Sequence, residues 1–164
     1  MGTEIERKFL VTSDSWRVGA TSQTLLRQGY LASDGGITVR VRSDGQRGWL
    51  TVKGPSEGCS RAEFEYEVPL EDAKALLELC GTRVVEKTRS RVPVGHQVWE
   101  VDEFAGANTG LTTAEIELQS EADKVAVPEW VGLEVTGDRR FDNASLSRCP
   151  YGDWAEADRV MVRQ

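Results

Sequence analysis

The chain has 164 residues, of which 29% are charged and 39% are apolar, and its net charge is −7. This composition is typical of one globular domain, and the acidic balance argues against nucleic acid or an anionic membrane as a partner. The chain has neither an apolar run of about 18 residues for a membrane helix nor an apolar secretion signal, so we expect a cytoplasmic protein.

Short segments of alternating polarity, separated by glycine-containing turns, run through the sequence. In chain order, we predict strand 3–11, helix 13–18, strands 24–32, 37–43, 47–53 and 61–68, helix 71–80, strands 83–92, 97–104 and 111–119, helix 120–127, strand 132–136 and helix 143–148. Asn143 is the expected N-cap of the last helix. Residues 1–150 are the predicted domain, and residues 151–164 form a tail that is either helical or frayed.

Eight or nine short strands with few helices predict a mostly β, α+β protein, built as an antiparallel barrel or sandwich. Because side chains alternate along a strand, each segment has two faces, and here the polar faces are almost entirely charged. The acidic pairs are Glu4/Glu6, Glu63/Glu65 and Glu115/Glu117, and the basic residues on other strands are Arg40/Arg42, Lys53 and Lys87/Arg89.

A solvated charged face is the simpler interpretation of any single strand. Solvated faces usually mix both signs, however, whereas these charges segregate by strand. We therefore predict an eight-stranded antiparallel barrel with a charged interior and with helices packed outside. Such a tunnel suits a polyanion that binds together with divalent metal ions, because Arg and Lys hold phosphate oxygens and paired carboxylates hold Mg²⁺ or Mn²⁺.

Cysteine and histidine do not suggest another metal site. Cys59, Cys80 and Cys149 are widely spaced, and His96 is the only histidine. Since no CxxC or Cys/His spacing is present, zinc binding is not expected, and the three cysteines are interpreted as reduced structural thiols.

Seven motifs occur in the order known from one family. They are ExExK (Glu4, Glu6, Lys8), RxR (Arg40, Arg42), Thr51-Val52-Lys53, ExE (Glu63, Glu65), Glu86-Lys87-Thr88-Arg89, Trp99-Glu100-Val101-Asp102 and a second ExE (Glu115, Glu117). Over about residues 3–147 the chain resembles the CYTH superfamily of triphosphate tunnel metalloenzymes. The resemblance implies an eight-stranded tunnel and a two-metal reaction on a triphosphate.

These motifs suggest roles for the charged residues. The expected phosphate ligands are Lys8, Arg40, Arg42, Lys53, Lys87 and Arg89, and Arg140, which lies outside the seven motifs, is expected to reach the tunnel as well. The expected ligands of two Mg²⁺ or Mn²⁺ ions are Glu4, Glu6, Glu115 and Glu117. Glu63, Glu65 and Asp102 are expected to complete the metal site or to orient water, and Lys87 is grouped with them as a catalytic residue. Because Arg61, Arg83 and Arg91 lie near strand ends, we expect them to be solvated.

Three functions are considered. Short bacterial members of the family resemble inorganic tripolyphosphatases, so hydrolysis of tripolyphosphate to pyrophosphate and phosphate is the leading prediction. A class IV adenylate cyclase or an organic triphosphatase, acting on thiamine or nucleoside triphosphates, is the alternative; no nucleobase-binding motif is evident, although Trp49 has inward parity. A non-catalytic polyphosphate-binding module is disfavoured, because an anion binder gains nothing from rows of Glu. Monomer and homodimer both remain open.

Overall fold

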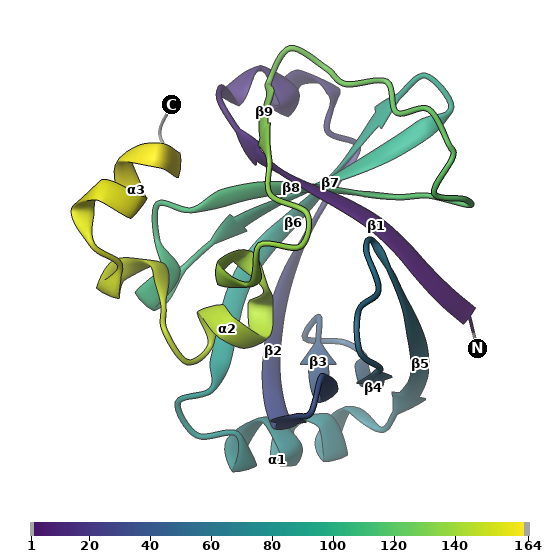
Figure 1. Cartoon of the computed structure of the whole chain (residues 1–164). Coiled ribbons are helices and arrows are strands. Elements are labelled where there is room, and N and C mark those ends of the chain that lie inside the picture. The colour runs from purple at the N-terminus through teal and green to yellow at the C-terminus, as the bar shows by residue number, and fades with distance from the viewer. Residues whose placement is uncertain (1, 163–164) are drawn as a thin grey trace.

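The computed structural model describes residues 2–162 and is dominated by β-structure (Figure 1). The strands are β1 (Gly2–Val11), β2 (Ser22–Asp34), β3 (Ile37–Ser43), β4 (Gly48–Lys53), β5 (Ser60–Val68), β6 (Val84–Val94), β7 (Gln97–Phe104), β8 (Thr112–Glu117) and β9 (Val131–Glu134). The α-helices are α1 (Leu70–Leu79), α2 (Asn143–Leu146) and α3 (Glu156–Val162). None of the described helices is long and apolar enough to cross a membrane.

Eight strands close into an antiparallel barrel, as the sequence predicted. The sheet order is β5-β4-β3-β2-β6-β7-β8-β1, and pairing of β1 with β5 closes the ring. β1 changes partners along its length: Gly2–Ile5 pair with β5, whereas Glu6–Leu10 pair with β8. The short strand β9 adds to β1 near Phe9 and Val11. The long first strand therefore brings its charged face against two acidic strands.

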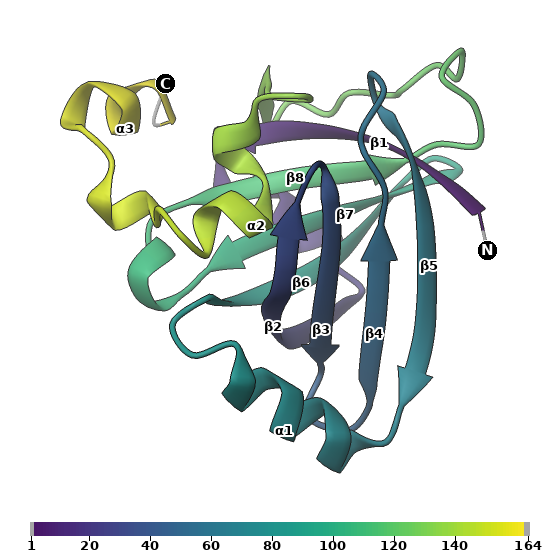
Figure 2. The same ribbon diagram turned by 60° about the horizontal axis from the view of Figure 1, so that its bottom comes forward.

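Two apolar clusters cover the outside of the barrel. Helix α1 lies across β2, β3 and β4 (Figure 2). Its Ala73 and Leu77 pack around Val41. Gly48 permits this approach, because a Cβ atom there would collide with Ala73. The second cluster lies on the outer faces of β1, β6, β7 and β8 and contains Phe9, Trp16, Val92, Trp99, Val101, Ala114, Ile116, Leu118 and Trp130. Burial of these faces leaves the charged faces to point inward.

A third apolar cluster fills one end of the barrel from within. Leu10, Val85 and Phe104 stand two residues from charged, inward-facing positions of their own strands, so alternation directs them inward as well. They pack with residues from the C-terminal part of the chain, namely Phe141, Leu146, Tyr151, Trp154 and Val162. Residues 151–153 form a 3₁₀ turn and α3 follows it. The tail thus contributes to the core.

Three predicted helices differ from the structure. Residues 120–127 are a loop, because the carboxylate of Asp123 accepts the backbone N–H groups of Gln119 and Ser120 and replaces helical bonding. The predicted helix 143–148 is the short α2, and its N-cap is Asp142 rather than Asn143. The segment near residues 13–18 is a 3₁₀ helix, Asp14–Gly19.

Candidate active site

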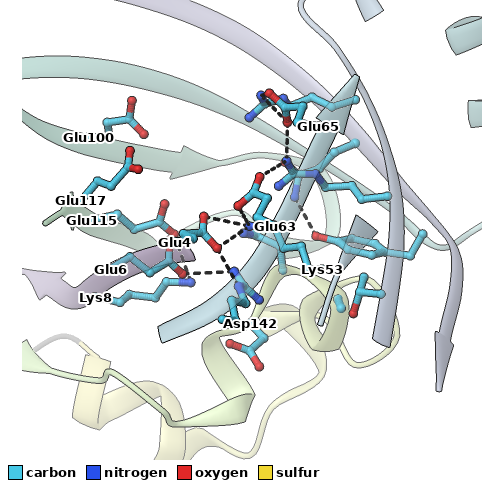
Figure 3. A pocket seen from close by; sticks show the side chains of 18 of the residues that line it. Glu4, Glu6, Lys8, Lys53, Glu63, Glu65, Glu100, Glu115, Glu117 and Asp142 are labelled. Atoms are coloured by element: carbon cyan, nitrogen blue, oxygen red, sulfur yellow. Dashed lines mark hydrogen bonds and ion pairs between the residues drawn. The ribbon is translucent and has the colours of Figure 1, made fainter. Parts of the chain in front are cut away.

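The charged inner faces meet in one cavity of about 390 Å³ (Figure 3). Every barrel strand contributes to its wall, and residues 142–144 at the start of α2 add to it. Its cationic side chains are Lys8, Arg40, Arg42, Lys53, Arg61, Lys87 and Arg89. Its carboxylates are Glu4, Glu6, Glu63, Glu65, Glu100, Glu115, Glu117 and Asp142. The predicted inward orientation of the ExE and RxR motifs is therefore confirmed.

The arginines of β3 converge on one carboxylate of β5. In the antiparallel register, Arg40 stands opposite Thr51, which stands opposite Glu65. Arg40 Nη2 donates to Thr51 Oγ1 at 3.0 Å and to Glu65 Oε2 at 3.1 Å, and Arg42 Nη2 donates to the same carboxylate at 3.2 Å. Burial tends to raise the pKa of Glu65, but Arg42, Thr51 and Arg40 together lower it. Two guanidinium groups are thus held side by side in the cavity.

A lysine links β1 to β5 at the next position of the wall. Lys53 Nζ lies 2.9 Å from Glu4 Oε2 and 3.1 Å from Glu63 Oε2. Burial alone would raise the pKa of Glu4, but Lys53 and Arg61 outweigh it and lower that pKa to about 2. The pKa of Glu63 is raised, first by burial and then by its contact with Glu4. Of the two β5 carboxylates, Glu63 therefore has the greater proton affinity.

The two cations of β6 rest on a fully buried carboxylate. Asp102 Oδ2 lies 2.5 Å from Lys87 Nζ and 2.6 Å from Arg89 Nη2. Arg89 also donates to Glu115 at 2.7 Å. Burial lowers the pKa of Lys87 to about 8, even though Asp102 acts in the opposite direction. Asp102 was expected to complete the metal site or to orient water, but it does not itself line the cavity and instead contacts Lys87 and Arg89, which it is placed to orient.

Lys8 lies at the apolar end of the cavity. Its Nζ atom is 3.0 Å from Glu115 Oε1 and donates to the backbone oxygen of Phe141 at 3.3 Å. Burial would lower the pKa of Lys8, but Glu115 and Glu6 outweigh burial and raise it. Lys8 is therefore charged and fixed between β8 and the C-terminal part of the chain.

Two arginines occupy positions other than those expected. Arg61 was expected at the solvated surface, yet it lies in the cavity, because the β1–β5 register places it directly opposite Glu4. Arg140 was expected to reach the cavity, but it lies outside. Its guanidinium is bound by Asp138 at 2.7 Å and by Asp158 at 2.9 Å, and its side chain is 45% exposed. Arg83 and Arg91 are exposed as expected.

The expected metal-binding carboxylates all line the cavity. In residues 2–162, however, no group of three or more potential ligands is already gathered around one point. Cations account for this: Glu4 is held by Lys53 and Arg61, and Glu115 is held by Lys8 and Arg89. The carboxylate oxygens have the chemistry that Mg²⁺ or Mn²⁺ requires, and burial together with Glu115 raises the pKa of Glu6. The donor set fits a divalent cation once these ion pairs rearrange.

Comparison with known proteins agrees with this architecture. Residues 2–145 match the CYTH domain. The chain belongs to the CYTH family. The inorganic triphosphatase of Acetivibrio thermocellus is 47% identical over 157 residues, which cover 95% of this chain and 100% of that protein. The inorganic triphosphatase of Nitrosomonas europaea is 39% identical over 150 residues, which cover 88% of this chain and 97% of that protein.

A solved CYTH structure has the same fold. The crystal structure of an inorganic triphosphatase aligns with a TM-score of 0.66 at 36% identity, covering 90% of this chain and 95% of that one. A protein from Pyrococcus horikoshii aligns with a TM-score of 0.57 at 22% identity, covering 72% and 79% of the two chains. At that identity the second likeness concerns the fold alone.

Three residues that line this CYTH cavity, Arg61, Glu100 and Asp142, were not predicted from the sequence to do so. Arg61 stands two residues before Glu63, so alternation alone could have placed it inside. Glu100 was assigned no role of its own, although it shares a face with Asp102. Asp142 enters from outside the barrel strands, and strand alternation gives no signal for it. Trp49, by contrast, does not line the cavity and packs beneath Arg42 and Arg47.

Proposed function

We propose that this protein hydrolyses inorganic tripolyphosphate to pyrophosphate and phosphate with the help of Mg²⁺ or Mn²⁺. The observation that carries the proposal is a single cavity lined by seven cationic and eight carboxylate side chains. A binder of anions alone would not need the carboxylates, whereas a metal-assisted phosphoryl transfer needs both kinds of group. The similarity to two inorganic triphosphatases supports the choice of substrate.

The basic residues would hold the phosphate oxygens. Arg40 and Arg42 both present guanidinium groups that can bind phosphate bidentately, and Lys53, Lys87, Arg89 and Lys8 line the same cavity. Asp102 would position Lys87 and Arg89 without contacting the substrate, because it binds both cations but does not line the cavity. The leaving pyrophosphate develops negative charge, so these cations would also stabilise the transition state.

The acidic residues would hold two divalent ions. The assigned ligands are Glu4, Glu6, Glu115 and Glu117, which project from the adjacent strands β1 and β8. The bound ions would neutralise phosphate charge and lower the pKa of an attacking water. Glu63 is the better placed of the two β5 carboxylates to accept a proton from that water. Its pKa is raised, whereas Glu65 is already engaged by Thr51 and two arginines.

The cavity offers little to an organic group. Among the described residues that line it, Tyr30 is the only aromatic one, and this residue is 4% exposed. Gln28 Nε2 donates to Tyr30 Oη at 2.8 Å, which fixes the ring in the wall. A nucleobase or a thiazolium ring would therefore lack a free aromatic surface on which to stack. This favours the inorganic substrate over ATP or thiamine triphosphate. Our expectation of a cytoplasmic monomer or homodimer, with no nucleic acid or membrane as partner, stays a prediction.

A substrate panel tests the proposal. Phosphate release should be measured from tripolyphosphate, ATP and thiamine triphosphate, each with Mg²⁺, with Mn²⁺ and with EDTA. We expect release from tripolyphosphate to be the fastest and to disappear in EDTA. Failure to release phosphate from tripolyphosphate with either metal would overturn the proposal. Formation of a cyclic nucleotide from ATP would instead establish the cyclase alternative.

A further inference from the structure

Arg61 stands between the tunnel and a second cavity. It lines the cavity described above and also an adjoining one of about 600 Å³, formed by the β2–β3 turn, the β4–β5 loop and residues 135–148. Toward the tunnel, its Nε donates to Glu4 Oε2 at 2.6 Å and its Nη2 donates to Glu6 Oε1 at 3.3 Å. One guanidinium thus spans two carboxylates that share a face of β1.

The guanidinium N–H groups of Arg61 therefore occupy the same carboxylate oxygens of Glu4 and Glu6 that a divalent cation would need as ligands. Glu4 and Glu6 would repel each other if no cation lay between them, and the fork of an arginine can bridge both. Arg61 cannot lose its proton at ordinary pH, so it must move away as a charged group if a metal ion takes those oxygens. Lys53 also holds Glu4, but its side chain is only 8% exposed and it is fixed by Glu63 as well.

The second cavity contains a carboxylate that can receive Arg61. Asp142 lines both cavities, and within residues 2–162 it has no ion-pair partner. It precedes α2, yet its side chain makes no capping hydrogen bond with that helix. Burial tends to lower the pKa of Arg61, but Glu4, Glu6 and, more weakly, Asp142 together raise it. Besides Glu4 and Glu6, which it contacts, the guanidinium therefore has Asp142 nearby as an alternative carboxylate partner.

We propose that Arg61 is an internal counter-ion of the metal site, which bridges Glu4 and Glu6 in the metal-free tunnel and turns toward Asp142 when a divalent cation takes their oxygens. The proposal rests on the proposed metal-binding role of these glutamates. Arg61 is then a positioning residue. It keeps the carboxylates together and limits metal affinity, so that the tunnel does not bind metal tightly before substrate arrives.

Metal binding without substrate tests this directly. The concentration of free Mn²⁺ can be followed by electron paramagnetic resonance in the absence of any phosphate, which gives a dissociation constant independent of turnover. Arg61→Gln removes the competing charge, so we expect Mn²⁺ to bind at least about tenfold more tightly than to the wild type. Arg61→Lys keeps a charge without the fork, and its affinity should lie between the two. Unchanged or weaker binding by Arg61→Gln would overturn the proposal.

Arg27→Gln is a matched control. Arg27 also bridges two carboxylates, with Glu86 at 3.3 Å and Glu78 at 3.7 Å, but it lies outside the barrel. Its replacement should leave Mn²⁺ affinity unchanged. A tightening equal to that of Arg61→Gln would mean that net charge alone is responsible, and the proposal would fail.

A double-mutant cycle examines the receiving carboxylate. Asp142→Asn should weaken Mn²⁺ binding, because Arg61 loses its alternative partner and stays on Glu4 and Glu6. In the Arg61→Gln background the same change should have a much smaller effect on Mn²⁺ affinity. Equal effects in both backgrounds would exclude the exchange between carboxylates.

The binding measurements also separate this role from the metal site on which it depends. If Mn²⁺ binds neither the wild type nor Arg61→Gln, both the proposed metal site and the counter-ion role are wrong. If Glu4→Gln abolishes binding but Arg61→Gln has no effect, only the counter-ion role falls.

Discussion

The basic and acidic walls of the tunnel follow the same strand alternation but are held in different ways. The basic wall consists of Arg40 and Arg42 on β3 and of Lys87 and Arg89 on β6, and each of these cations is anchored by Glu65 or Asp102. The acidic wall consists of the Glu pairs on β1 and β8.

The acidic wall is less completely neutralised. Within the described part of the chain, Glu117 has no ion-pair partner, and Glu6 is paired only with Arg61. The basic wall is thus held in place by its own carboxylates, whereas the acidic wall retains carboxylates that our proposal assigns to divalent cations. Substitutions in the two walls should therefore have different effects on stability, on turnover and on the dependence of turnover on metal concentration.

The largest effect is expected where the basic wall is anchored. Asp102→Ala leaves Lys87 and Arg89 without the carboxylate on which they rest, and loss of one partner of a buried pair costs about 3–5 kcal/mol. The free energy of unfolding, measured by urea denaturation, should fall by that amount. Glu103→Ala is the control, because Glu103 pairs with Arg17 on the outside and its loss should cost less than about 1 kcal/mol. Equal losses in the two variants would show that Asp102 anchors nothing.

A smaller effect on stability but a large one on turnover is expected in the acidic wall. Glu117→Gln unpairs no cation within the described residues, so the fold should survive. Loss of a residue that only orients a metal ligand typically lowers metal affinity or activity by about 10–100-fold. Because Glu117 is itself a proposed ligand, turnover should fall by about 100-fold or more. Steady-state kinetics on tripolyphosphate across a Mg²⁺ or Mn²⁺ titration should show partial recovery at high metal. Wild-type kinetics in this variant would remove Glu117 from the metal site.

Substitution of a proposed phosphate ligand should behave differently from Glu117→Gln. Arg40→Ala removes charge-assisted hydrogen bonds that are each worth about 1.5–3 kcal/mol, so kcat/KM should fall by about tenfold or more. We expect no recovery at high metal, because the lost contact is with phosphate. Arg47→Ala, which removes an exposed arginine packed on Trp49, is the control. Rescue of Arg40→Ala by metal would contradict the division into two walls.

The smallest effect is expected for the arginine that lies outside. Arg140 is 45% exposed and is engaged by Asp138 and Asp158. Because exposed ion pairs contribute about 0–1 kcal/mol, Arg140→Ala should change stability only within that range and leave kcat/KM within about twofold. A tenfold loss of kcat/KM with an intact fold would show that Arg140 reaches the substrate after all.

Local patterns explain why so much of the barrel was predictable. Strand alternation is a property of the backbone, so the charged faces of β1, β3, β5 and β8 could be identified from residue parity. The segment 120–127 shows the limit of this approach. The predicted helix there relied on Pro128 as its stop signal, but hydrogen bonds from the backbone N–H groups of Gln119 and Ser120 to the Asp123 carboxylate hold the segment as a loop.

Residue parity and motif order were enough to identify which faces of the strands are charged, that acidic and basic residues lie on different strands, and that the chain matches an ordered set of family motifs. Which charges face each other became known only from the folded barrel. The β1–β5 register opposes Arg61 to Glu4, and the C-terminal part of the chain brings Asp142 to the cavity and leaves Arg140 outside it. Parity has a period of two residues and carries no information about partners that lie 57 or 127 positions apart. Pairing across the barrel follows from register and closure, which depend on the packing of the whole chain.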